Sequence, residues 1–211
     1  MNIEFKRKGT MTSVIREKNG VVWISHKIFD AFPKLNMAYS TRIGGVSTGV
    51  CSSMNLRNCE WDTIDNYKTN LHLFCDAAGF DHDRIVATAQ THTSNVVCVH
   101  EKDAPKGTLF DSHYENVDGL VTNVPGITLL TSFADCIPVF LYDPVQNAIG
   151  SCHSGWKGTL GQIGKRTVEL MTKEYKSRPE DIIAGIGPGI CRDCYEVSDD
   201  LYEMFSAVTG P

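Results

Sequence analysis

The sequence lacks the features that mark several large classes of protein. No stretch comes near the 18 or so consecutive apolar residues that a membrane-spanning helix requires. No cluster of five or more Lys and Arg occurs, and the formal net charge is −5, so a nucleic acid would meet no basic surface. Residues 1–10 carry charges but no apolar stretch of the kind found in export signals. We therefore expect a cytoplasmic protein that binds neither nucleic acid nor membrane.

Two common phosphate-binding motifs are also absent, since neither GxGxxG nor GxxxxGK[ST] occurs in the sequence. No internal repeat and no linker of biased composition interrupts the chain. Its 211 residues, 42% hydrophobic and 21% charged, are typical of an ordinary globular domain that needs no covalent crosslinks. We expect one domain over residues 1–211.

The chain contains eight cysteines, a number that would suit a disulfide scaffold in a short secreted protein. Here they are scattered through hydrophobic segments, so most are expected to be reduced and buried. The C-x-x-C pair "CRDC" at 191–194 has no second pair to complete a four-cysteine zinc site. It also lacks the strand and helix context of thioredoxin-like motifs, so a redox role is not favoured.

Periodicity predicts a chain rich in strands. A helix is expected over 62–79, with Asp62 as its N-cap and Gly79 as its stop. A second, amphipathic helix is expected over 159–176. Its predicted apolar stripe consists of Leu160, Ile163, Val168, Leu170 and Met171. Strands are expected on both sides of His92, several more over 117–156, and a last one over 181–190. Helices do not alternate regularly with strands, so the predicted class is α+β, with sheets covered by helices.

Three polar residues stand out among these strands. His92 in "AQTHTS" is expected near a strand end, and Cys136 in "FADCIP" and His153 in "SCHSGW" are expected on two of the strands. They are far apart in the sequence, unlike zinc-finger ligands, which pair two to four residues apart. Three distant ligands that leave a fourth position open are the arrangement of catalytic zinc sites. Alternatively, Cys136 is a nucleophile with His153 as its base and Asp135 as the orienting acid. A third interpretation is that all three are core residues. The residue types and their spacing alone do not distinguish the three interpretations.

Five blocks of sequence carry a resemblance to a known family. They are "TRIGGVSTG" with "MNL", "QTHTSNV", "DGLVTNVPGITLLTSFADCIPV", "HSGWKGTLGQI" and "GIGPGICRDCYEV", in order between about residues 38 and 200. Together they resemble the YfiH-type family, also called the laccase-domain or polyphenol oxidase family, which is associated with purine nucleoside phosphorylase activity. The resemblance implies an α+β fold of stacked mixed sheets flanked by helices. It also implies that His92, Cys136 and His153 bind zinc.

The family is also linked to copper-dependent phenol oxidation. A soft thiolate with two imidazoles binds Cu(I) as well as Zn²⁺, but a multicopper oxidase needs many His ligands in close motifs. The seven His of this chain are scattered. We therefore treat a laccase-like activity as a property of copper-loaded protein and as an alternative to the main function.

The main function implied by the resemblance is phosphorolysis of purine nucleosides, with adenosine deamination as a side activity. In deamination, a zinc-bound hydroxide would attack the ring carbon that carries the amine. Asp135 would move a proton or orient a ligand, and Phe133 and Trp156 would stack on the base. Some relatives are linked to peptidoglycan precursor editing, so a metal-free Cys/His hydrolase is a further alternative. The expected partners are small molecules, and the expected state is a monomer or weak homodimer.

Substrate contacts are predicted at four positions. Arg42 and the N–H groups around Gly44 would bind phosphate or ribose hydroxyls, as would Asn55 in the "MNL" block. Lys157 stands where relatives often carry Arg, so it would act as a point charge on an anion. Family members usually continue beyond the equivalent of Pro211. Either the protein is short, or the chain lacks a C-terminal segment of the domain.

Overall fold

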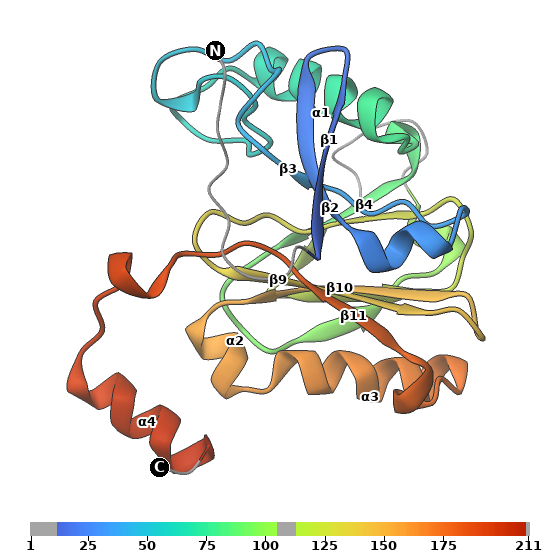
Figure 1. Ribbon diagram of the computed structural model, residues 1–211, viewed down its shortest axis with the longest axis vertical. Coiled ribbons are helices and arrows are strands. Elements are labelled where there is room, and N and C mark those ends of the chain that lie inside the picture. The colour runs from blue at the N-terminus through green and yellow to red at the C-terminus, as the bar shows by residue number, and fades with distance from the viewer. Residues whose placement is uncertain (1–11, 105–112, 210–211) are drawn as a thin grey trace. The chain divides into compact units, whose positions relative to one another are not determined.

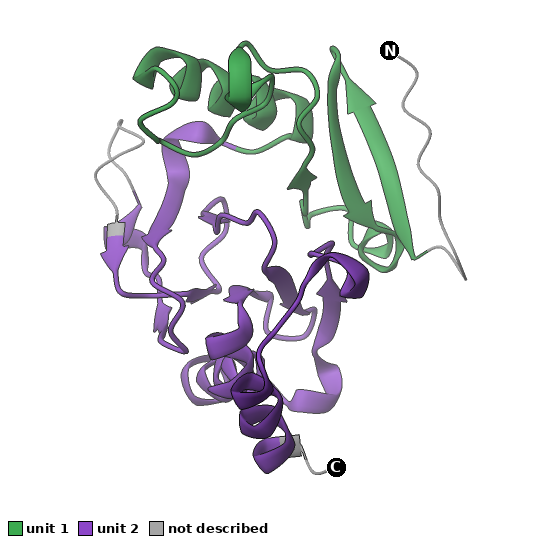
Figure 2. Cartoon of the chain, turned by 90° about the vertical axis from the view of Figure 1, so that its left-hand side faces the viewer, with its two compact units in different colours: residues 1–80 green, residues 81–211 purple. Residues whose placement is uncertain are grey.

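The computed structural model describes residues 12–104 and 113–209. The segment 1–10, in which no export signal is predicted, lies outside them. The chain divides into two compact units, Met1–Phe80 and Asp81–Pro211, which are described separately (Figure 2). Within the described residues, no helix combines the length and apolar character needed to cross a bilayer. The expectation of a single domain over 1–211 stays a prediction.

The first unit contains an antiparallel sheet and one long helix. The sheet consists of β1 (Ser13–Lys18), β2 (Val21–His26) and β3 (Tyr39–Ser40) in that order. Asn19 and Gly20 join β1 to β2 with positive φ angles of 55° and 82°, as two-residue hairpins favour. Helix α1 (Ile64–Ala78) shares a buried cluster with β2. That cluster consists of Val21, Trp23, Met54, Phe74 and Ala77.

Helix α1 begins one residue later than the sequence predicts. Its N-cap is Thr63, whose side chain accepts a hydrogen bond from Asn66 N, so the prediction of Asp62 as the cap is wrong. Asp62 instead accepts hydrogen bonds from Ser47 Oγ at 2.5 Å and from two asparagine side chains. The prediction of Gly79 as the stop is confirmed, because its φ of 83° is the left-handed conformation that glycine adopts without strain.

The second unit contains two sheets. The larger has the order β11-β9-β10-β7-β5, antiparallel except for the β5–β7 pair, and the smaller has the parallel order β6-β4-β8. The strand bounds are β4 Ile85–Ala89, β5 Val96–Cys98, β6 His113–Glu115, β7 Gly119–Thr122, β8 Thr128–Leu130, β9 Ile137–Asp143, β10 Ala148–Ser154 and β11 Ile183–Ile186. Val86 of β4 and Leu120 of β7 are fully buried in one cluster, so the two sheets share a core. The predicted α+β class is confirmed.

The helix expected over 159–176 is two helices, α2 (Trp156–Leu160) and α3 (Ile163–Tyr175). They separate at Gln162, whose φ of 57° does not continue a right-handed helix. Helix α3 covers one face of the larger sheet (Figure 1). Of the predicted stripe, Ile163 and Met171 are fully buried, and Thr167 joins them by donating its hydroxyl hydrogen bond to Ile163 O at 2.8 Å.

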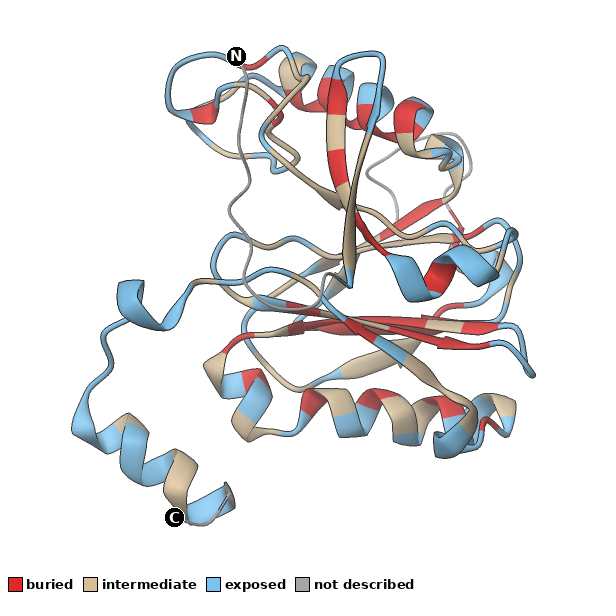
Figure 3. Cartoon of the chain, in the orientation of Figure 1, coloured by how far each residue is buried: buried red, intermediate tan, exposed pale blue. Residues whose placement is uncertain are grey.

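The chain after β11 continues through an exposed segment to helix α4 (Asp199–Thr209). Short 3-10 helices occupy Lys27–Ala31 (η1), Gly49–Cys51 (η2), His82–Arg84 (η3), Glu101–Asp103 (η4), Pro179–Asp181 (η5) and Arg192–Cys194 (η6). The whole stretch from 191 to 200 is exposed to solvent (Figure 3).

Candidate metal centre

His92, Cys136 and His153 lie together in the second unit. Their ligand atoms are all within 4.8 Å of one another, and the centroids of the two imidazole rings are 4.8 Å apart. His153 is buried, Cys136 half-buried and His92 exposed, so the cluster opens to solvent on the His92 side. The structure therefore brings together three residues that are distant in the sequence.

Strand pairing explains how Cys136 meets His153. Strands β9 and β10 are antiparallel, and their register places His153 opposite Pro138 and Ser154 opposite Ile137. Cys136 lies in a bend directly before β9, so the thiol is one residue beyond the end of the paired segment. The expectation that Cys136 lies on a strand is therefore wrong.

A fourth residue, Asp118, connects two of the three ligands, and sequence reasoning missed it. Its carboxylate is fully buried and accepts hydrogen bonds from His153 Nδ1, Thr93 N and Thr93 Oγ1, all at 2.8 Å. It also accepts hydrogen bonds from His92 N at 3.1 Å and Thr91 N at 3.3 Å. Asp118 O accepts a further one from His153 N at 2.7 Å. The available signal was an acid within the otherwise apolar stretch "VDGLV", because a buried acid requires partners.

The charge of Asp118 sets the tautomer of His153. Burial by itself raises the pKa of Asp118, but hydrogen bonds from Thr93 N–H, His153, the Thr93 hydroxyl and Thr91 N–H lower it below its usual value. An ionised carboxylate only accepts hydrogen bonds, so Nδ1 of His153 must carry the proton. Nε2 is then left with its lone pair, which is the form in which an imidazole binds a metal.

The same carboxylate holds the loop that carries His92. The φ of His92 is 62°, in the left-handed region that residues other than glycine seldom adopt. Asp118 accepts hydrogen bonds from the N–H groups of three consecutive residues, Thr91, His92 and Thr93. These bonds account for the persistence of the unusual conformation.

Gly155 marks a small space among the three ligands. A Cβ atom at this position would lie 3.0 Å from Cys136 Sγ, 3.1 Å from His92 Cδ2 and 3.7 Å from His153 Cε1. The three ligand side chains therefore surround a space beside residue 155, and this space stays open because residue 155 is a glycine. Two imidazoles and one thiolate are also a donor set that suits Zn²⁺ or Cu(I), so the residues fit a metal ion.

Comparisons with known proteins identify the family of this chain. The family model described as multi-copper polyphenol oxidoreductase laccase matches residues 36–210. The chain belongs to this family. Over 170 residues it is 39% identical to "Purine nucleoside phosphorylase" of Deinococcus radiodurans, a match that covers 81% of this chain and 62% of that protein.

A second relative is "Adenosine deaminase RL5" of an unknown prokaryotic organism. It is 37% identical over 133 residues, which cover 60% of this chain and 48% of the relative. The crystal structure of Bacillus licheniformis hypothetical protein YfiH is similar, with a TM-score of 0.82, 28% identity, and coverage of 92% of this chain and 72% of that one. The predicted resemblance to YfiH-type proteins is thus confirmed. The chain spans less than two thirds of the length of the two relatives.

The cluster of His92, Cys136 and His153 differs from the metal centres of multicopper oxidases. Within residues 12–104 and 113–209, the cluster of His92, Cys136 and His153 is the only group of three or more His, Cys, Asp and Glu placed to hold a metal ion. Multicopper oxidases require several His-rich sites in close motifs. The described part of this chain therefore offers one metal position.

Cys136 is better suited to bind a metal than to act as a free nucleophile. Burial, followed by the negative charges of Asp135 and Asp118, raises the pKa of its thiol. A thiol with a raised pKa is mostly protonated at neutral pH and reacts slowly, whereas a bound metal ion removes the proton. Cys152, next to His153, is fully buried, and burial raises its pKa to about 11, as expected of a core residue.

Four other residues predicted to take part in the site also belong to the second unit. The ring centroid of Phe133 is 5.6 Å from that of His153, so Phe133 forms part of the wall of the site. Lys157 Nζ lies 5.3 Å from the ring centroid of Trp156, within the range of a cation–π contact. Asp135 is exposed, and its carbonyl oxygen accepts a hydrogen bond from Ile190 N at 2.8 Å. The carboxylate that orients a ligand is that of Asp118.

The residues of the first unit that are predicted to contact substrate make hydrogen bonds or close backbone contacts within that unit. Arg42 donates from Nε and Nη2 to Ser52 O, at 2.9 and 2.6 Å, and from Nη2 to Val50 O at 2.6 Å. Asn55 Nδ2 donates to Asp62 Oδ2 at 2.8 Å. Gly44 has a φ of 96°, and a Cβ atom there would lie 2.4 Å from the carbonyl oxygen of Gly20. These contacts shape the loop between β3 and α1, and a role in substrate binding stays a prediction.

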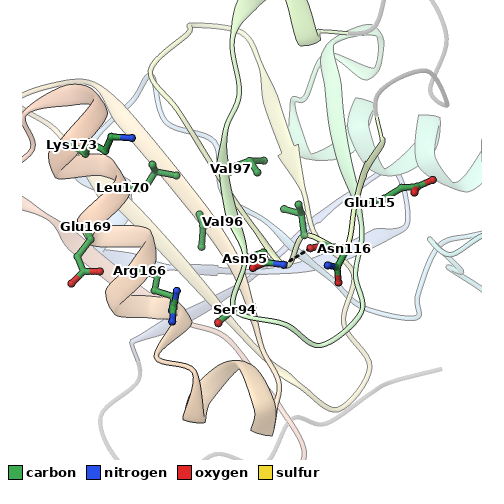
Figure 4. A pocket seen from close by; sticks show the side chains of 11 residues that line it. Ser94, Asn95, Val96, Val97, Glu115, Asn116, Arg166, Glu169, Leu170 and Lys173 are labelled. Atoms are coloured by element: carbon green, nitrogen blue, oxygen red, sulfur yellow. Dashed lines mark hydrogen bonds between the residues drawn. The ribbon is translucent and has the colours of Figure 1, made fainter.

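A separate hollow of about 630 Å³ lies in the second unit (Figure 4). It is bounded by residues 94–97, by residues 115–117 and by one side of α3, which contributes Arg166, Glu169 and Lys173. Its lining includes none of the three ligands, and its charges are of both signs. We therefore do not assign the substrate to this hollow.

Proposed function

We propose that this chain is the metal-binding part of a zinc-dependent purine nucleoside phosphorylase, with adenosine deamination as a side activity. The observation that carries the proposal is the convergence of two imidazoles and one thiol around Gly155, where a metal ion has donors and a neighbouring face is open to solvent. The names of the two relatives support this choice of substrate class. We also propose the cytoplasm as its location, and a monomer or weak homodimer as its state.

His92, Cys136 and His153 would hold the metal ion, and Asp118 would keep the proton on Nδ1 of His153. A zinc ion bound there would supply a Lewis acid and an activated water. Phe133 would stack on a purine, and its apolar ring, whose centroid is 5.6 Å from that of His153, supports this role. Lys157 is exposed and would attract phosphate as a point charge. We retain Arg42, Gly44 and Asn55 as proposed contacts with ribose or phosphate, and Asp135 as a proposed proton carrier.

The first experiment is metal analysis of protein purified without chelator. We expect stoichiometric zinc in the wild type and its loss in Cys136→Ser, because one of three ligands is removed. Cys59→Ser is the matched control: Cys59 is also a half-buried free cysteine, but it lies in the other unit. Wild-type protein without bound metal, or equal metal in Cys136→Ser, would contradict the proposal.

The second experiment tests the reaction. Phosphorolysis breaks the bond between the base and ribose C1′ and joins C1′ to a phosphate oxygen. The protein should therefore release free base and ribose 1-phosphate from adenosine, inosine or guanosine only when phosphate is present. Inosine formed from adenosine without phosphate would report the deaminase activity. If every nucleoside remained intact, the phosphorylase proposal would fail.

Two alternatives are tested in parallel. Copper-dependent phenol oxidation is favoured by the family description and by the thiolate in the donor set. It predicts oxidation of a phenol by copper-loaded protein and none by zinc-loaded protein. A Cys/His hydrolase is favoured by the arrangement of Cys136, His153 and Asp118, which also fits a nucleophile, a base and an orienting acid. It predicts hydrolysis of a cell-wall amide by metal-free protein.

A further inference from the structure

The C-x-x-C pair, for which the sequence alone did not favour a redox role, has no part in the proposed metal centre. Its geometry in the structure is compatible with a disulfide. Cys191 and Cys194 lie at the two ends of the exposed turn that contains η6, and Cys194 N donates a hydrogen bond to Cys191 O at 3.0 Å. This bond closes a turn in which the first and fourth Cα atoms are less than about 7 Å apart, which is the separation a disulfide can bridge. Both cysteines are exposed to solvent.

The two thiols differ in reactivity. A hydrogen bond from the Cys194 thiol, together with the backbone N–H groups of Asp193 and Cys194, lowers the pKa of Cys191. Cys194 donates this hydrogen bond, and the same bond therefore raises the pKa of the Cys194 thiol. An accessible thiol of lowered pKa beside a second thiol is the arrangement found in redox-sensing cysteines.

We propose that Cys191 and Cys194 form a dithiol that hydrogen peroxide or an organic hydroperoxide converts reversibly to an intramolecular disulfide. The Cys191 thiolate attacks a peroxide oxygen, so that an S–O bond forms and the O–O bond breaks. The leaving oxygen takes a proton and departs as water or an alcohol. The Cys194 sulfur then attacks the sulfenic acid of Cys191, the S–S bond forms, and a second water leaves. An external dithiol reduces the product back to the two thiols.

The pair directly follows a segment that is held against the metal centre. Gly187 N donates to Pro138 O at 2.9 Å, and Ile190 N donates to Asp135 O at 2.8 Å. These bonds join the residues before Cys191 to residues on both sides of the ligand Cys136. Cys191 therefore lies one residue from a hydrogen bond that anchors the segment carrying the ligand Cys136. The proposed oxidation of the pair does not depend on the proposed phosphorylase activity.

A second cysteine pair provides an internal comparison. Cys51 Sγ and Cys59 Sγ are 3.9 Å apart, but Cys51 is buried. Burial, followed by a hydrogen bond and the charge of Cys59, raises the pKa of Cys51. Proximity alone would favour a disulfide between these two residues, whereas accessibility and thiolate character favour Cys191 and Cys194. Comparing the two pairs therefore shows whether proximity of the sulfur atoms, or accessibility and a lowered thiol pKa, decides which disulfide forms.

The test exposes reduced wild-type protein to stoichiometric hydrogen peroxide and then blocks the remaining thiols with an alkylating reagent in denaturant, so that buried thiols also react. The chain is then digested with a protease that cleaves after lysine. The chain contains no lysine after Lys176, so Cys191 and Cys194 remain in one peptide, 177–211. We expect this peptide to lose two hydrogen atoms and resist alkylation until it is treated with dithiothreitol. Cys51 and Cys59 should be alkylated throughout.

Two variants test the order of the steps. Cys194→Ser should accumulate a sulfenic acid at Cys191 that dimedone traps, whereas Cys191→Ser should react much more slowly. Equal rates in the two variants, an alkylated wild-type pair after peroxide, or oxidation confined to Cys51 and Cys59 would each overturn the proposal. A zinc ion that is bound by the Cys136→Ser protein and lost from the double variant with Cys191→Ser would also overturn it, because the pair would then be a metal site.

Discussion

At the residue scale, Asp118 does more to organise the metal ligands than any residue singled out in the sequence. It fixes the protonated nitrogen of His153 and accepts the hydrogen bonds of the backbone that carries His92. Carboxylates that bind metal-ligating imidazoles in this way raise metal affinity without touching the metal.

Replacing Asp118 with Asn should weaken zinc binding by about 10- to 100-fold. An amide group has one acceptor oxygen, so its NH₂ must face either His153 Nδ1–H or the N–H groups of Thr91 and Thr93. Titration against a competing chelator measures the affinity, and the ring nitrogen shifts of His153 in NMR report its tautomer. Thr93→Val is the control, since it removes only the hydroxyl that donates at 2.8 Å. An unchanged affinity in Asp118→Asn would refute the positioning role.

Gly155→Ala should lower metal affinity while the fold persists. Its φ of −70° suits any residue, so the added methyl group acts only through its approach to Cys136 Sγ at 3.0 Å and His92 Cδ2 at 3.1 Å. Gly164→Ala is the matched control, because nothing lies within 4 Å of that position in α3. The control should keep its metal and gain about 0.5–1 kcal/mol in stability. Equal metal content and affinity in the two variants would argue against the enclosed site.

At the scale of elements, the loop before α1 depends on a single carboxylate. Hydrogen bonds from Ser47, Asn55 and Asn66 lower the pKa of Asp62 to about 2. Arg42 closes the same loop through the carbonyl oxygens of Ser52 and Val50. The stability of this loop should therefore depend on pH in the acid range.

A group whose folded pKa is lowered stabilises the fold above its unfolded pKa, and this contribution disappears as the pH falls toward the folded value. Wild-type protein should therefore lose the contribution of Asp62 between about pH 4 and pH 2. The difference in denaturation midpoint between wild type and Asp62→Asn should be constant above about pH 5 and shrink below it. A difference that does not depend on pH would show that the charge of Asp62 has no such role.

At the scale of the whole molecule, all three metal ligands lie in the second unit. A ligand that binds only the folded state stabilises it by about 2.7 kcal/mol at a hundredfold excess over Kd. Added zinc should therefore raise the thermal unfolding midpoint of the chelator-treated wild type. Cys136→Ser should show no such rise, and the midpoint should fall again when chelator is added. An equal rise in both proteins would indicate zinc binding elsewhere.

Much of the fold could be predicted because its signals are local. The helical periodicity and Gly79 located α1 to within two residues, and the content of Val and other β-branched residues indicated the strands on both sides of His92. The errors were local as well. Thr63 and Asp62 are both good cap residues, and the left-handed turn at Gln162, which divides α2 from α3, has no strong signal in its side chain.

The α+β class followed from local patterns of residues, and the motif blocks pointed to His92, Cys136 and His153. The folded chain was needed to show that these residues meet, that Asp118 joins two of them, and that Arg42 is engaged by its own loop. The difference lies in the range of the interactions. Propensities and caps act over a few residues, whereas the site depends on the register of β9, β10 and β7, which brings together residues far apart in the chain.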